Sequence, residues 1–222
     1  ERFISWDDGP DRIWFAATKN GLVVSAIILS PTGILYPVFG NSPESLNKDG
    51  LALLIEDRRV RSIQGQIDDV RICETFLERR GSINFERVDY TLMRLDSNPY
   101  VTSLVAGPAE LIIRTASLED AEKIFPLQAA YEIEEVLPPH ISFKPGASRL
   151  ALERTLARRI ALVAEYEGQI VGKANTNARS FERDQIGGVY VLPEYRGQGI
   201  ATRLVSALCV ILNDDARGIN LF

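Results

Sequence analysis

The clearest hydrophobic pattern lies near the carboxyl end of the chain, where an extended run passes through a loop into a helical run. Val189, Tyr190 and Val191 are β-branched or aromatic, and Pro193 ends the strand because proline has no N–H to donate. Apolar residues then recur at helical spacing in two adjacent stripes, one of Ile200, Leu204, Leu208 and Ile211 and one of Val205, Cys209 and Leu212. We therefore predict a strand, a loop and a largely buried helix.

The first half of the chain alternates extended runs with turn signals. Runs at residues 13–17, 22–29 and 34–39 are separated by Asn20-Gly21 and by a turn ending at Gly33, which predicts an antiparallel meander. A helix beginning at Ser42 and Pro43 and leading into residues 51–55, a strand at 61–65, a helix at 67–80 and a strand at 90–95 follow.

The second half repeats this order of elements. A strand at residues 111–114 precedes a capping box from Ser117 to Asp120, which starts a helix that Pro126 should bend unless the helical pattern restarts there. A helix near residues 149–159 leads to a hairpin of strands at 160–164 and 170–175, and Gly187-Gly188 suits a bulge or close backbone approach. We predict an α/β fold in two domains, residues 1–108 and 109–222.

The loop between the last strand and helix has the features of an anion site. Gly197 and Gly199 permit backbone angles that other residues resist, and the helix that follows offers unpaired N–H groups and the positive end of its dipole. A phosphate or pyrophosphate suits such a cradle. The alternative is a tight turn with no ligand.

The residues from Val189 to Ala201 resemble the acyl-CoA pyrophosphate loop of the GNAT superfamily of N-acetyltransferases. The family signature, Arg/Gln-x-x-Gly-x-Gly/Ala, is carried here by Arg196, Gly199 and Ala201. The resemblance implies a mixed, largely antiparallel sheet flanked by helices, acetyl-CoA as cosubstrate and no metal. The cofactor-binding residues that it implies are Val189, Tyr190, Val191, Arg196, Gly197, Gln198, Gly199, Ile200, Ala201 and Thr202.

The resemblance also implies catalytic residues. Backbone groups of Val189 and Val191 would hold the pantetheine arm, and the Val191 N–H would polarise the thioester carbonyl. Glu134 and Glu135 border the implied acceptor site, and either could bind or deprotonate an amine. A carboxylate would act as the base directly only if burial raised its pKa, and otherwise it would orient the cation or a relay water. An exposed acidic helix end is the alternative.

Three polar residues alternate along one strand face. Lys173, Asn175 and Asn177 either line a cleft that binds the acceptor or face solvent, and the sequence leaves both interpretations open.

The first half departs from the family pattern. Its corresponding loop, residues 40–44, lacks the cradle and places Glu44 where it would repel a pyrophosphate. We expect a degenerate GNAT-like domain that helps shape the acceptor cleft or only stabilises its neighbour. Family members usually continue with another helix and two strands, so we expect the second domain to be incomplete and assign no general acid.

Composition narrows the partners and excludes other chemistries. The chain of 222 residues has 25 Lys and Arg against 30 Asp and Glu, with no basic stripe, so we expect no nucleic acid. No apolar run reaches the ~20 residues of a membrane span. Cys73 and Cys209 are expected in the core of a cytoplasmic protein, and the sole histidine, His140, is expected in a loop, with no metal site or hydrolase triad.

We therefore expect an acyl-CoA-dependent N-acetyltransferase that brings acetyl-CoA and a primary amine together for direct attack in a ternary complex. The alternative is a CoA-binding or protein-interaction module with little or no turnover. A dinucleotide-binding oxidoreductase is disfavoured because Thr202 stands where the fingerprint needs its third glycine. The acceptor and the oligomeric state stay open.

Overall fold

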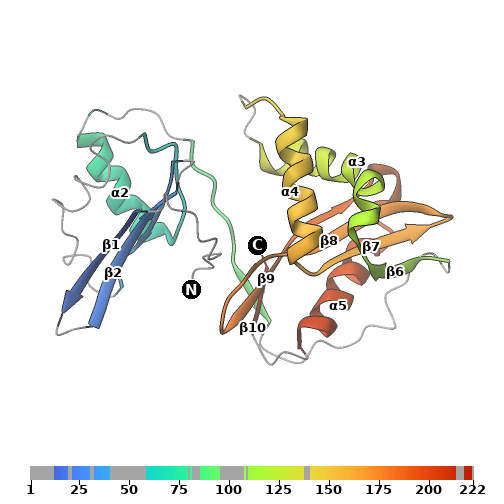
Figure 1. The fold of residues 1–222 in the computed structure, drawn as a ribbon. Coiled ribbons are helices and arrows are strands. Elements are labelled where there is room, and N and C mark those ends of the chain that lie inside the picture. Colours follow the sequence, from blue (N-terminus) through green and yellow to red (C-terminus); the bar gives the residue numbers. More distant parts are fainter. Residues whose placement is uncertain are drawn as a thin grey trace. The chain divides into compact units, whose positions relative to one another are not determined.

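The computed structural model describes residues 13–19, 22–30, 33–40, 59–79, 81, 86–95, 108, 110–137, 141–213 and 218–221 (Figure 1). Its contacts form two compact units, which divide between Val88 and Asp89. We call the described residues up to Val88 the amino-terminal unit and residues 89–222 the carboxy-terminal unit. The domain boundary expected from the sequence, at residues 108 and 109, stays a prediction.

The amino-terminal unit is a small sheet with one helix. Strands β1 (Ile13–Lys19), β2 (Leu22–Leu29) and β3 (Ile34–Val38) form the predicted antiparallel meander, and β4 (Ser62–Ile63) pairs in parallel with β3. Helix α2 (Ile67–Arg79) packs against this sheet. The core contains Ile27, Leu29, Leu35, Phe39, Cys73 and Leu77. The helix expected from Ser42, the loop at residues 40–44 and its Glu44 lie wholly or mainly outside the described residues.

The last strand expected in the first half belongs to the other sheet. Within residues 90–95, only Met93–Leu95 form a strand, β5, which pairs antiparallel with β10 of the carboxy-terminal unit, with Arg94 opposite Asn220. The sequence prediction that this strand completes the first half is therefore wrong. The local sequence pattern predicts that these residues form a strand. The strand with which they pair depends on which sheet edge still has unpaired backbone N–H and C=O groups.

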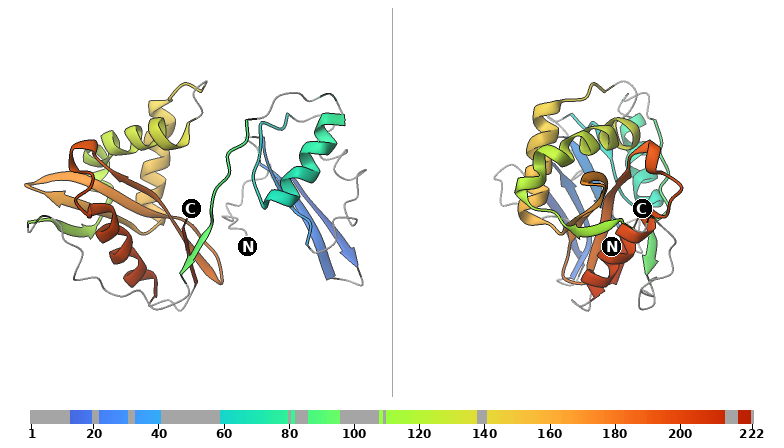
Figure 2. Two further views of the ribbon diagram at one scale, coloured as in Figure 1. Left: turned by 180° about the vertical axis from the view of Figure 1, so that it is seen from behind. Right: turned by 90° about the vertical axis from the view of Figure 1, so that its right-hand side faces the viewer.

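The carboxy-terminal unit is a six-stranded sheet between two layers of helices (Figures 1 and 2). Its order is β5-β10-β9-β8-β7-β6, and every neighbouring pair is antiparallel except β9 and β10. The strands are β6 (Ile112–Thr115), β7 (Ala161–Tyr166), β8 (Gln169–Arg179), β9 (Arg183–Val191) and β10 (Gly218–Leu221). This is the mixed, largely antiparallel α/β architecture that the sequence predicts.

The helices cover opposite faces of this sheet and enclose two cores. Helices α3 (Ala121–Tyr131) and α4 (Pro145–Arg158) lie on one face, and α5 (Ile200–Asn213) lies on the other. Leu204, Leu208 and Leu212 of α5 are fully buried, whereas Ile211 is 40% exposed. Ile211 was expected in the buried stripe, but its position on α5 turns it away from the sheet.

Helix α3 continues through Pro126 and changes at its end. Ile124 and Leu127 are buried on either side of the proline, so packing holds the helix across the missing backbone hydrogen bond. The helical geometry changes at a π-helix, Glu132–Val136, which carries the acidic residues. An extra residue per turn alters which way successive side chains point.

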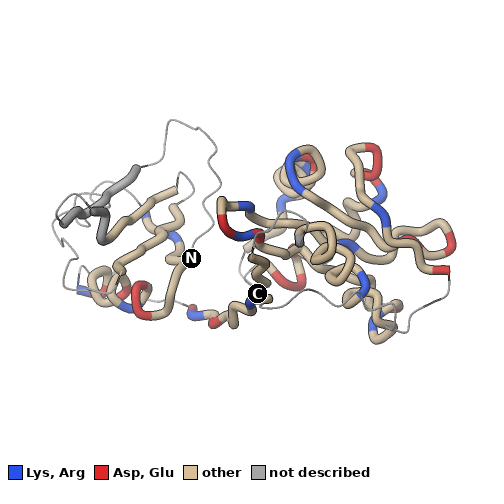
Figure 3. The backbone as a smooth tube through the Cα atoms, turned by 90° about the horizontal axis from the view of Figure 1, so that it is seen from below, with Lys and Arg blue, Asp and Glu red and all other residues tan. Residues whose placement is uncertain are grey.

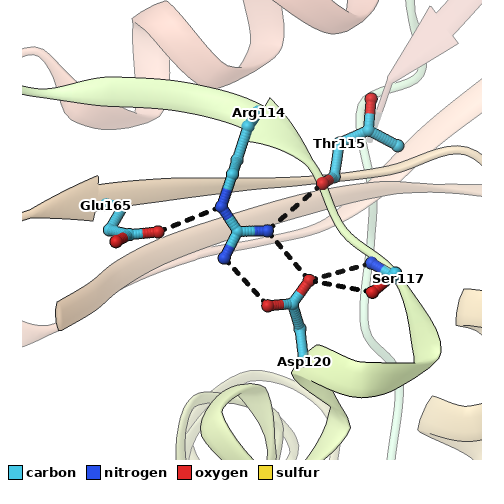
Figure 4. A network of polar contacts seen from close by, with 5 residues as sticks. All are labelled: Arg114, Thr115, Ser117, Asp120 and Glu165. Atoms are coloured by element: carbon cyan, nitrogen blue, oxygen red, sulfur yellow. Dashed lines mark hydrogen bonds and ion pairs between the residues drawn. The ribbon is translucent and has the colours of Figure 1, made fainter. Parts of the chain in front are cut away.

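An ion-pair network links β6, β7 and the turn before α3 (Figure 4). Arg114 on β6 donates to both oxygens of Asp120 at 2.8 Å and to Glu165 on β7 at 3.0 Å. Asp120 also accepts from the backbone N–H of Ser117 at 2.9 Å, which confirms the predicted capping box. The bonds from Arg114 and Ser117 hold the pKa of Asp120 at about 2.

Candidate functional site

The loop before α5 has the geometry expected of an anion cradle. A 3-10 turn, Pro193–Tyr195, follows β9, and Gly197 and Gly199 have φ angles of 75° and 76°. These left-handed angles suit glycine, since a Cβ would strain the backbone there. The predicted strand, loop and helix are therefore confirmed, with the helix beginning at Ile200.

The start of α5 supplies the donors. Its first helical hydrogen bond runs from the Arg203 N–H to the Gly199 carbonyl at 3.0 Å. The N–H groups of Ile200, Ala201 and Thr202 precede that bond and have no intrahelical acceptor. Three N–H groups and the helix dipole thus converge at the loop, as phosphate binding requires.

Packing beneath the loop holds this helix end in place. Ile200 and Leu204 are 1% and 0% exposed. A Cβ on Gly172 of β8 would lie 3.1 Å from Leu204 Cδ1 and 3.2 Å from Ile200 Cγ2. The sheet and α5 therefore approach closely, and the cradle is fixed to the core.

Strands β8 and β9 are irregular beside the paired glycines. The register shifts between Lys173 and Asn175, where Ala174 alone faces both Gly188 and Val189, and Gly188 has a φ of 58°. A Cβ on Gly188 would lie 2.2 Å from Asn175 Oδ1. The bulge expected at these glycines is confirmed.

The side chains of Lys173, Asn175 and Asn177 lie along this irregularity with different exposure. Lys173 is buried, Asn175 is half-buried and Asn177 is exposed. Asn175 Nδ2 donates to Asn177 Oδ1 at 3.1 Å. The row therefore runs from solvent into the interior, and its role in binding an acceptor stays a prediction.

Glu134 connects the π-helix to the end of β9. The Tyr190 hydroxyl donates to one carboxylate oxygen at 2.6 Å, and Arg196 donates to the other at 2.7 Å. These two bonds lower the pKa of Glu134, the bond from Tyr190 having the larger effect. A direct base needs the opposite shift, so this geometry favours the alternative in which Glu134 orients a cation.

Arg196 is folded back onto β9. Its Nε donates to the Val191 carbonyl at 3.0 Å, and its guanidinium carbon lies 5.2 Å from the centre of the Tyr190 ring. Arg196, which the resemblance implies as a pyrophosphate-binding residue, is therefore paired with Glu134 in this structure. Gln198 is exposed beside it, its side chain donating to the Glu194 carbonyl at 3.5 Å.

The other acids of the π-helix differ in their contacts. Glu132 accepts hydrogen bonds from Gln128 at 2.8 Å and from Ser148 of α4 at 2.9 Å. Glu135 is exposed and forms no hydrogen bond or ion pair with the described residues. Its catalytic role stays a prediction.

Tyr131 is a site residue that the sequence did not predict. The Lys173 ammonium nitrogen lies 4.5 Å from the centre of the Tyr131 ring, and the Tyr131 and Tyr190 rings meet edge to face at 6.4 Å. Burial raises the pKa of both tyrosines. The sequence signal that could have indicated Tyr131 is its helical spacing from Ile124 and Leu127, which places its side chain on the buried face of α3.

Lys173 is the most perturbed cation of this group. Its Nζ donates to the Gly188 carbonyl at 2.9 Å, and its side chain is almost fully buried. Burial lowers its pKa from 10.5 to about 7, against the smaller opposing effect of Glu132. A neutral amine is therefore well populated near neutral pH.

The remaining expectations about ligands concern the described residues only. These residues contain no group of three or more His, Cys, Asp or Glu side chains placed to hold a metal ion, and no helix among them is long and apolar enough to cross a membrane. Lys and Arg are interspersed with Asp and Glu along the described chain (Figure 3). Cys73 and Cys209 are both buried, as predicted, and His140 lies outside the described residues.

Solved structures similar to this chain include several acetyltransferases. A ribosomal-protein-alanine N-acetyltransferase from Brucella melitensis biovar Abortus 2308 is 24% identical, over 50% of this chain and 77% of that one, with a TM-score of 0.41. A GNAT-family acetyltransferase from Streptococcus pneumoniae is 18% identical, over 50% and 73%, with a TM-score of 0.41. PaiA N-acetyltransferase from Thermoplasma acidophilum, solved with coenzyme A, is 15% identical, over 48% and 74%, with a TM-score of 0.38.

The family comparison covers the cradle and most of the sheet around it. No curated protein matches the chain. The model of the acetyltransferase (GNAT) family matches residues 127–221, which include the π-helix, β7 to β10 and α5. Residues 127–221 of this chain therefore have the sequence pattern of the acetyltransferase (GNAT) family.

Proposed function

We propose that this protein is an N-acetyltransferase that uses acetyl-CoA and transfers the acetyl group to a primary amine by direct attack in a ternary complex. The observation that carries the proposal is the glycine loop at the start of α5, with Gly197 and Gly199 at left-handed angles inside the segment that matches the family. The N–H groups of Ile200, Ala201 and Thr202 bind the pyrophosphate there.

The remaining parts of the cosubstrate follow β9. The backbone of Val189, Tyr190 and Val191 runs towards the loop from the bulge at Gly188, and the pantetheine arm lies along it. The Val191 N–H donates to the thioester carbonyl oxygen, which becomes an oxyanion during attack. Arg196 and Gln198 flank the pyrophosphate.

The acceptor approaches from the face covered by α3 and the π-helix. Glu134 or Glu135 attracts its ammonium group, and Lys173, Asn175 and Asn177 border its path. Positioning the amine beside the thioester supplies most of the rate, since intramolecular geometry removes much of the entropic barrier.

A second candidate is a CoA-binding module with little or no turnover. It is favoured by one observation, that both carboxylate oxygens of Glu134 are already hydrogen-bonded and its pKa is lowered. Such a carboxylate is a poor proton acceptor near neutral pH.

Calorimetric titration of the whole chain with acetyl-CoA, with NADH in parallel, tests the proposal. Gly199→Glu should abolish acetyl-CoA binding, because it puts a negative side chain into the cradle. Gly168→Glu is the matched control, since Gly168 has a similar φ of 78° and a Cβ there would meet nothing within 4 Å. Absence of acetyl-CoA binding by the folded wild-type chain would refute the proposal.

Turnover separates the two candidates. The chain is incubated with acetyl-CoA and with free amino acids, a polyamine or a lysine-containing peptide, and released thiol is measured. Thiol release that depends on one of these amines supports the transferase. Acetyl-CoA binding with no thiol release above the amine-free control supports the binding module.

A further inference from the structure

Lys173 is held at the irregular pairing of β8 and β9. Its Nζ donates to the carbonyl of Gly188, the residue immediately before Val189, at 2.9 Å. The register of the two strands shifts between Lys173 and Asn175, and Gly188 lies in the resulting bulge, so the amine is hydrogen-bonded to the bulge itself. This places the amine next to the segment of β9 that is proposed to hold the acyl arm.

The surroundings of Lys173 favour a free amine. The residue is 4% exposed, and its bond to Gly188 is the one hydrogen bond that its nitrogen makes with the described residues. An ammonium group has three N–H donors, and leaving donors unmatched in a buried place is costly. The Tyr131 ring at 4.5 Å stabilises the cation only in part.

The charged and titratable groups around the amine come from three elements. Glu132 of the π-helix acts on Lys173 electrostatically but bonds to Gln128 and Ser148. Tyr131 of α3 presents its ring, and Tyr190 of β9 gives its hydroxyl hydrogen bond to Glu134. Neither Glu132 nor Glu134 forms an ion pair with Lys173 within the described chain.

We infer that Lys173 is itself an acyl acceptor, which acetyl-CoA bound along β9 modifies within the same chain. This inference rests on the proposed function, because it needs the acyl arm beside Val189. The free amine of Lys173 attacks the thioester carbonyl carbon, a C–N bond forms and the C–S bond breaks. The proton lost from Nζ ends on the CoA sulfur, which leaves as the thiol.

Acetylation would change the site that it occurs in. The product is a neutral amide, which removes the cation from the face of Tyr131 and fills space beside Gly188. The path bordered by Asn175 and Asn177 then ends at an acetyl group instead of an amine. Self-acetylation thereby blocks the inner end of this path and limits further transfer.

Mass spectrometry of the purified 222-residue chain after incubation with acetyl-CoA tests the inference. We expect one acetyl group, mapped to Lys173, and labelling that rises with pH through about 7, where the free amine becomes the main form. Lys123 and Lys144 are exposed and serve as internal controls. Lys173 should react about ten-fold faster or more, since proximity and a lower pKa both favour it.

Variants separate enzymatic from chemical labelling. Lys173→Arg should lose the acetyl group, because a guanidinium is not nucleophilic, and Gly199→Glu should lose it by removing the bound cosubstrate. Gly168→Glu should keep it. Acetyl phosphate, which lacks the pyrophosphate-bearing part of CoA, should label Lys123 and Lys144 without preference for Lys173.

If Lys173 is not acetylated, calorimetric titration with acetyl-CoA shows whether the self-acetylation inference alone fails or the proposed function fails with it. Acetyl-CoA binding with Lys173 unlabelled, or labelled no faster than Lys123 and Lys144, overturns the inference and leaves the proposed function standing. No acetyl-CoA binding overturns both.

Discussion

Replacing Asp120 by Asn should destabilise the carboxy-terminal unit by an amount that depends on pH. The Asp120 side chain is 11% exposed and pairs with Arg114 at 2.8 Å. Its pKa is lowered from 3.8 to about 2, chiefly by the hydrogen bonds from Arg114. Each pKa unit corresponds to about 1.4 kcal/mol, so we expect a loss of about 2 kcal/mol of unfolding free energy at pH 7.

The direction of the pH dependence follows from the folded pKa lying below the unfolded one. The ionised carboxylate contributes its full stability above about pH 5, and this contribution is lost as the pH falls through about 2. Asn is neutral throughout. The difference between wild type and Asp120→Asn should therefore shrink to about half near pH 3.

Urea unfolding at pH 7 and pH 3, followed by circular dichroism, measures this difference. The chain has two tryptophans, Trp6 and Trp14, and Trp14 lies on β1, so tryptophan fluorescence reports on the amino-terminal unit. Glu119→Gln is the matched control, since Glu119 is exposed and makes no hydrogen bond or ion pair with the described residues, and its effect should stay below about 0.5 kcal/mol. An Asp120→Asn loss that is equal at both pH values would refute the electrostatic reasoning.

Three further variants probe the cradle and the two cores. Glu134→Gln should bind acetyl-CoA several-fold more tightly in calorimetry, because Arg196 loses its carboxylate partner and becomes available to the pyrophosphate; unchanged affinity would contradict this. Leu204→Ala should cost about 2–5 kcal/mol in urea unfolding, since Leu204 is fully buried under the sheet. Gly33→Ala should lower the tryptophan-monitored stability of the amino-terminal unit by at least about 1 kcal/mol, because a Cβ there would lie 2.6 Å from the Arg59 carbonyl at a φ of 85°; a neutral effect would be the contrary result.

Local signals in the sequence were sufficient for most elements around the site. Val189 to Val191, Pro193 and the two loop glycines predict the strand, its end and the left-handed turn, because each acts on its own backbone angles. The capping box at Ser117 and Asp120 was readable for the same reason, since its partners are three residues apart. The antiparallel meander and α2 were predicted from periodicity and turn residues.

Such local signals did not reveal which elements, far apart in the sequence, lie next to each other in the fold. The strand at residues 90–95 was predicted, but its pairing with β10 depends on a free sheet edge more than a hundred residues further along the chain. Pro126 was expected to bend its helix unless the helical pattern restarts there; the helix continues through Pro126, and the burial of Ile124 and Leu127 holds it on the sheet. Tertiary packing outweighs local preference in both places.

The sequence by itself determined the glycine loop, the helix that follows it and the family to which they point, because these depend on backbone angles and spacing over a few residues. Only the tertiary structure decided the state of the chemical groups. Glu134 meets Tyr190 and Arg196 across 56 and 62 residues. Lys173 is buried because α3 covers its strand, and burial, not residue type, sets whether an amine is charged.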